Sequence, residues 1–165
     1  MTAMRSFLVF LLFFSIAGNA SSVSNSRQSC IRGAMAAGSA AVGNATQLNA
    51  LYERYFEGER IAQLSAGKSW KRYSKAQKNA QRNRVRRFVI HTLAPSLSSY
   101  GGSRVKFISE SGSKVKGVIT APNGIRRTIT WHFAGSCTFI NVAIEGFGSL
   151  ISFVGSESVR SGRSQ

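Results

Sequence analysis

The chain has 165 residues, and its 22 Lys and Arg stand against only 6 acidic residues, which gives a net charge of +16. A surface this basic attracts polyanions, either nucleic acid or anionic lipid headgroups. The sequence has no Asp, two His and two Cys. This shortage of reactive and metal-binding side chains argues against an enzyme and against a metal site.

The first twenty residues have the pattern of an export signal. Arg5 precedes an apolar run over residues 7–17, and the small residues Gly18 and Ala20 follow it. We expect a signal peptide cleaved after Ala20; the alternative is an N-terminal membrane anchor, for which the run is short. A protein outside the cytoplasm meets membranes and seldom meets nucleic acid. We therefore expect a periplasmic protein whose partners include no nucleic acid.

Helical patterns follow a less regular segment. Residues 21–44 are rich in Ser, Ala and Gly, so we expect a poorly structured leader with at most one helical stretch, over residues 30–37. From Ala45 onward, apolar residues recur at steps of three and four, which predicts a helix that is broken at Gly58. A second, short helix is expected to end near Gly67.

A long third helix is expected to begin after the N-cap residue Ser74. Pro95 lies within its apolar pattern and cannot donate to the carbonyl of His91, so it should kink the helix or end it early. Gly101 and Gly102 stop the helix. The expected buried stripe comprises Val85, Phe88, Val89, Leu93, Leu97 and Tyr100.

The remainder of the chain alternates between polar and apolar residues, which predicts strands. A last, weak helix is expected over residues 150–160. Helices followed by an antiparallel meander predict an α+β fold, in which N-terminal helices pack on one face of a curved sheet of about four strands. The expected strands cover residues 104–108, 115–120, 127–133 and 138–145.

Each expected strand has one apolar face that would meet the helices. In the last strand this face would hold Ile140 together with Val142 and Ile144, opposite Asn141. The apolar faces could fill a solid core or line a hydrophobic pocket, and periodicity alone favours the core. The candidate pocket residues are Leu93, Leu97, Tyr100, Val105, Phe107, Val115, Ile119, Ile129, Trp131, Phe133, Val142 and Ile144.

The few reactive side chains form no recognisable catalytic set. His91 and His132 come without a nucleophile or an orienting group in a motif, and no G-x-S-x-G elbow is present. Two cysteines make no metal motif. Outside the cytoplasm Cys30 and Cys137 could form a disulfide, or Cys137 could be a buried free thiol; the sequence supports both equally.

A basic run extends from Lys68 to Arg87. One interpretation is docking on anionic lipid, at about 1 kcal/mol for each well-placed basic residue near the surface. The other is ordinary solvation of a helix face. The first interpretation leaves open a basic secreted module that docks on anionic membranes without an internal lipid cavity.

The sequence resembles the MlaC family of periplasmic phospholipid-transport proteins, also called toluene-tolerance auxiliary proteins. Residues 55–70, YFEGERIAQLSAGKSW, contain the family's aromatic-acidic pair, its E-R-[MI]-A segment and its Gly-x-x-Trp. The chain departs from the family pattern where Gly58 replaces an apolar residue, Cys137 a Trp and Asn141 an Asp, where Gly148 stands near the family's Ser, and in its short C-terminal tail, residues 151–165, which is rich in Gly and Ser. The matches that follow residue 70 are Ser74, Gln77, Phe88, Thr92, Leu93, Ala94, Leu97, Tyr100, Val142, Glu145 and Gly146.

The resemblance implies a twisted sheet and helices that enclose a deep apolar pocket for phospholipid tails. It implies a shuttle that exchanges phospholipid with an outer-membrane lipoprotein complex and an inner-membrane ABC transporter complex, with the lipid as cargo and no other cofactor. The lipid-binding domain would cover residues 45–160, with a short tail over residues 161–165. The candidate pocket residues would then form a sheet wall and a helix wall around the acyl chains.

Overall fold

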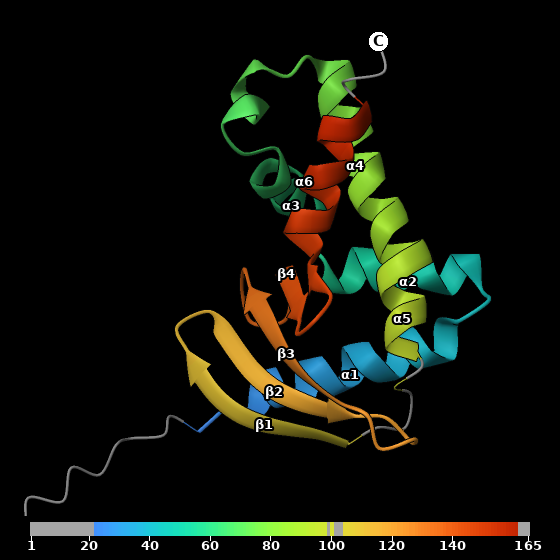
Figure 1. Ribbon diagram of the computed structural model, residues 1–165, viewed down its shortest axis with the longest axis vertical. Coiled ribbons are helices and arrows are strands. Elements are labelled where there is room, and N and C mark those ends of the chain that lie inside the picture. Colours follow the sequence, from blue (N-terminus) through green and yellow to red (C-terminus); the bar gives the residue numbers. More distant parts are fainter. Residues whose placement is uncertain (1–21, 99, 101–103, 162–165) are drawn as a thin grey trace, which may run out of the picture.

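The computed structural model describes residues 22–98, 100 and 104–161, and for residues 97, 98 and 157–161 it describes the backbone alone (Figure 1). The expected signal peptide therefore lies outside the described residues. A group of helices occupies one end of the molecule and the sheet the other (Figure 1). None of the helices in the described ranges combines the length and apolar character needed to cross a bilayer.

The first helix, α1, runs over Asn25–Ala41, which differs from the expectation of a poorly structured leader. The expected helical stretch over residues 30–37 is only its middle. Ile31 is fully buried in the core, and Cys30 is bonded to Cys137 in a disulfide between α1 and the loop before the fourth strand. Within the expected leader, α1 thus contributes both to the core and to the covalent anchoring of the domain.

Helices α2 (Ala45–Tyr55) and α3 (Gly58–Ala66) follow the expected pattern. The Asn44 side chain caps α2 by accepting from the Gln47 backbone N–H at 3.0 Å. A Cβ on Gly58 would lie 1.9 Å from the hydroxyl oxygen of Tyr52, so any larger residue there would require the Tyr52 ring to move. The buried apolar residues of α2 are Leu48, Leu51, Tyr52 and Tyr55.

A short 3₁₀ helix, η1 (Gly67–Arg72), leads to α4 (Lys75–Phe88). The expected N-cap of α4 is present as a full capping box, in which Ser74 and Gln77 each bond the other's backbone N–H. The rod continues as the π-helical turn η2 (Val89–Leu93) and as α5 (Ala94–Ser98).

Pro95 does not end this rod, which extends to Ser98. The Ala94 N–H donates to the carbonyl of Val89, five residues earlier, so the turn before Pro95 is wider than an α-helical turn. A proline ring clashes with the carbonyl four residues before it in a regular α-helix. The π turn is the local adjustment with which the helix continues through Pro95.

Five strands in the described part of the chain form an antiparallel sheet in sequence order, which confirms the α+β fold. The fifth strand was not expected. Helix α6 (Leu150–Ser161) follows and packs against α3 and α4. The strands are β1 (Arg104–Ser111), β2 (Lys114–Thr120), β3 (Arg126–Phe133), β4 (Phe139–Ile144) and β5 (Gly148–Ser149).

The expected alternation in β4 is wrong at its start, because the pairing with β3 shifts by one residue there. Phe133 pairs with Phe139, whereas Trp131 pairs with Val142. The inward residue is therefore Phe139, which is 2% exposed, and not Ile140. Asn141 is also buried rather than outward, and its Oδ1 accepts from the Ile151 N–H at 3.1 Å in the first turn of α6.

Candidate functional site

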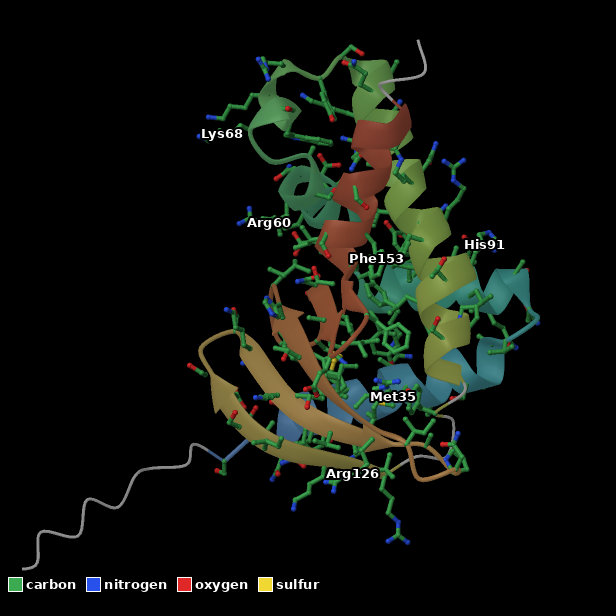
Figure 2. All side chains as sticks on the ribbon, viewed as in Figure 1. Met35, Arg60, Lys68, His91, Arg126 and Phe153 are labelled. Atoms are coloured by element: carbon green, nitrogen blue, oxygen red, sulfur yellow. A yellow bond between two sulfur atoms is a disulfide. The ribbon has the colours of Figure 1, made fainter. Side chains whose placement is uncertain are left out.

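An apolar inner cavity lies where α1, the η2 turn and the sheet meet. Its volume of about 30 Å³ is room for a water or two. Met35, on α1, projects into the space between that helix and the sheet (Figure 2). The complete lining is Ala34, Met35, Gly38, Leu51, Phe56, Val89, Leu93, Ala94, Trp131, Phe139 and Val142.

A larger cleft opens between the α4–η2–α5 rod and the β4–β5–α6 segment. Its volume of about 300 Å³ is at the lower end of the range for ligand sites. Phe153 projects from α6 toward α4 (Figure 2), where its ring stacks on Phe88 at 5.4 Å between centroids. The lining is Phe88, Thr92, Leu93, Ser96, Tyr100, Val142, Ile144, Phe147, Gly148, Ser149, Leu150 and Phe153.

The cleft and the inner cavity are neighbours. Leu93 and Val142 line both of them, so these two buried side chains form the partition between the cleft and the smaller inner cavity. Leu93 comes from the π turn and Val142 from β4, so the partition joins the helix wall to the sheet wall. Separating them would join the two spaces into one apolar channel.

The structure brings five of the twelve candidate pocket residues to these spaces: Leu93, Tyr100, Trp131, Val142 and Ile144. Phe107 packs half-buried against the core, and the side chain of Leu97 lies outside those described. The others are buried in the core and line neither the cleft nor the inner cavity: Val105, Val115, Ile119, Ile129 and Phe133.

Several lining residues were not anticipated from the sequence. Met35 belongs to the supposed leader, and Phe139 lies beyond the register shift of β4. Phe147 and Phe153 lie in a segment rich in Gly and Ser, yet they are among the exposed large apolar side chains, at 57% and 41%. The signal in the sequence that could have identified these lining residues is the presence of two phenylalanines in a segment otherwise rich in Gly and Ser.

A third, polar hollow of about 290 Å³ lies between α2, α3 and α4. Its charges are paired internally, Arg82 with Glu59 and Arg86 with Glu53. The hydrogen bond from Arg82 lowers the pKa of the Glu59 carboxyl, and burial raises the pKa of Tyr52. Because these charges already have partners, the hollow offers less to a charged ligand than its composition suggests.

The reactive side chains are dispersed. His91 is exposed and points away from the cleft (Figure 2), and His132 lies on the opposite face of β3 from Trp131. Burial lowers the pKa of His132, with a contribution from the Lys114 charge. Within the described residues no three His, Cys, Asp or Glu gather as metal ligands would. The open question about the cysteines is resolved, since Cys30 and Cys137 are bonded.

Comparison with known proteins agrees with this architecture. No curated protein matches the chain. The fold is similar to that of a phospholipid-binding protein from Ralstonia solanacearum solved in complex with a phospholipid, with a TM-score of 0.64 and 14% sequence identity, over 84% of this chain and 87% of that one. The family model described as MlaC protein matches residues 32–157. The chain therefore belongs to the MlaC family.

Proposed function

We propose that the protein binds a phospholipid by its acyl chains and carries it between membranes. The observation that carries this proposal is the pair of adjacent apolar spaces, the cleft and the inner cavity, with Leu93 and Val142 as their shared wall. Membership of the MlaC family, and a similar fold that holds a phospholipid in the Ralstonia protein, support the choice of ligand.

Loading must move the walls, because the spaces are small in the described conformation. A cleft of about 300 Å³ and a cavity of about 30 Å³ are tight for a two-chain lipid. Apolar burial provides about 0.8 kcal/mol per methylene, so ten buried methylenes contribute about 8 kcal/mol toward opening and binding. We expect the helix wall to move at the π turn, because this turn interrupts the regular hydrogen-bond pattern of the helix.

The proposed setting is the periplasm, where the cargo would pass between an outer-membrane lipoprotein complex and an inner-membrane ABC transporter complex. Two features support export. The N-terminal sequence has a signal-like pattern, and disulfides such as Cys30–Cys137 persist in oxidising compartments. The proposal assigns no chemical reaction to the protein.

Transfer between vesicles tests the carrier proposal directly. Donor vesicles would contain a self-quenched fluorescent phospholipid, and the mature chain would be added with unlabelled acceptor vesicles. We expect dequenching whose rate rises with protein concentration. A rate equal to that without protein, for a chain shown to be folded, would contradict the proposal.

A second candidate function is docking on anionic membrane surfaces, and one feature favours it. The end of the molecule farthest from the sheet carries exposed basic side chains on η1 and at the start of α4, and Lys68 points outward there (Figure 2). Co-sedimentation with phosphatidylglycerol vesicles, lost in a Lys68→Glu, Lys71→Glu double variant, would support this function, and equal sedimentation of both proteins would contradict it. The exposed basic residues are Lys68, Lys71, Arg72 and Lys75.

A further inference from the structure

One arginine lies on the apolar face of the sheet, at its end. Within β3 the inward residues Ile129, Trp131 and Phe133 are all buried, and Arg127 precedes them in the same alternation. Its cross-strand partner is the fully buried Ile119. A charged side chain in this position needs a partner, because arginine is almost never buried unpaired.

The guanidinium of Arg127 lies at the rim of the cleft. Its central carbon is 5.0 Å from the ring centroid of Phe147, which lines the cleft and is 57% exposed. Its Nη1 is held near the turn after β4, since it would lie 3.4 Å from a Cβ placed on Gly146. The charge therefore lies where the apolar lining gives way to solvent.

The Nε of Arg127 is buried and has no hydrogen-bond partner. A buried donor without an acceptor destabilises the fold, and more so when the group is charged. The ion pairs among the described residues, Arg27–Glu110, Arg82–Glu59 and Arg86–Glu53, do not include it.

The nearby acid does not satisfy this donor. Glu145 accepts from the Thr128 N–H at 3.3 Å. Hydrogen bonding to Thr128 lowers the pKa of Glu145, with smaller contributions from the charges of Lys116 and Arg127. The Glu145 carboxylate is therefore engaged by Thr128 and leaves the Arg127 Nε without an acceptor.

We propose that Arg127 binds the phosphate of the lipid whose acyl chains occupy the cleft. The inference rests on the proposed carrier function. A phosphodiester presents two anionic oxygens, and arginine donates to such a pair through its planar fork. Nε would gain the acceptor that it lacks, while Phe147 would hold the guanidinium plane in position. The protein would then select phospholipids over uncharged lipids with the same chains.

The test compares two lipids that differ only in the phosphate-containing headgroup. The purified mature chain is incubated with vesicles containing phosphatidylglycerol or the diacylglycerol with the same chains, and bound lipid is measured by mass spectrometry after re-isolation. The variants are Arg127→Gln, Arg127→Lys and the control Arg126→Gln. Arg126 is the adjacent residue, exposed and directed away from the helices (Figure 2), so its substitution makes the same change in charge outside the cleft.

We expect the wild-type chain to prefer phosphatidylglycerol by about 10- to 100-fold, the range for hydrogen bonds to a charged group. Arg127→Gln should remove this preference while diacylglycerol binding stays unchanged, which also shows that the variant is folded. Arg127→Lys should retain part of the preference, and Arg126→Gln all of it. Millimolar inorganic phosphate should not displace the lipid.

The outcomes separate this inference from the carrier proposal. A wild-type chain that binds neither lipid would overturn both. Binding of both lipids with equal affinity, or a preference that Arg127→Gln leaves intact, would overturn the role of Arg127 alone. Displacement of phosphatidylglycerol by inorganic phosphate in the wild type but not in Arg127→Gln would show a site for free phosphate and overturn its assignment to a lipid headgroup.

Discussion

Replacing Ile144 with arginine should block the cleft while the fold survives. Ile144 lines the cleft and is half-buried, so a longer polar side chain can reach solvent from its position. Val142 is a poorer choice, because at 3% exposure an arginine there would enter the core and could unfold the chain.

The expected loss of lipid affinity follows from what the new guanidinium must do. Either the incoming acyl chain desolvates it, at several kcal/mol for an ion, or it turns outward across the cleft and displaces methylenes at about 0.8 kcal/mol each. Displacing four methylenes costs about 3 kcal/mol, which corresponds to about a 100-fold weaker binding.

The assay is titration of the chain with a fluorescent phospholipid, alongside urea unfolding of the same samples. The matched control is Thr128→Arg, which places the same side chain on the outer face of β3, near Glu145. We expect the control to bind as the wild type does. Undiminished lipid binding by a folded Ile144→Arg protein would refute the assignment of this wall.

Three further perturbations test other parts of the account. Reducing the bond between Cys30 and Cys137, 107 residues apart, should lower the free energy of unfolding by up to about 5 kcal/mol, and equal urea midpoints with and without reductant would contradict this. Because burial and Lys114 lower the pKa of His132 below its ordinary 6.5, the folded state favours the neutral ring; stability present above pH 6.5 should be lost as the pH falls through the lowered pKa, and His132→Gln should remove this loss in urea titrations across pH. Leu93→Ala should cost about 2–5 kcal/mol of stability and join the two apolar spaces; a urea-derived loss below about 1 kcal/mol would show that Leu93 is not a packed partition.

The parts of the fold that could be predicted from the sequence are those specified by local patterns. The apolar face of α2, the capping box of α4 and the alternation in β2 each depend on neighbours within a few residues. Strand order followed from short connections between successive strands.

The full extent of the first helix, beyond the expected stretch over residues 30–37, was not predicted because its packing depends on small residues. A Cβ on Gly33 would lie 3.1 Å from the Tyr55 hydroxyl oxygen, and one on Gly38 would lie 3.5 Å from a Leu51 methyl. Small side chains let α1 approach α2 closely, but in the sequence they resemble an unstructured leader. The contacts that order α1 come from α2, from α5, from Glu110 of β1 and from the disulfide to Cys137, none of which a local pattern in residues 21–44 reveals.

The candidate site was only partly predictable, for two physical reasons. A period-two pattern cannot reveal the register shift that turns Phe139 inward and Ile140 aside. Apolar periodicity also cannot separate a cavity wall from a filled core, which is why Ile129 and Leu93 looked equivalent although only Leu93 lines the spaces. The pairing of Cys30 with Cys137 could not be predicted either, because it depends on the tertiary fold that brings together residues 107 positions apart.

The most direct test of the carrier account is native mass spectrometry of the mature chain purified without detergent from a bacterial periplasm. We expect a folded protein with mass additions that match phospholipids, and a reduced share of these additions in Ile144→Arg. A folded wild-type chain with no added mass, both as purified and after incubation with phospholipid vesicles, would contradict it.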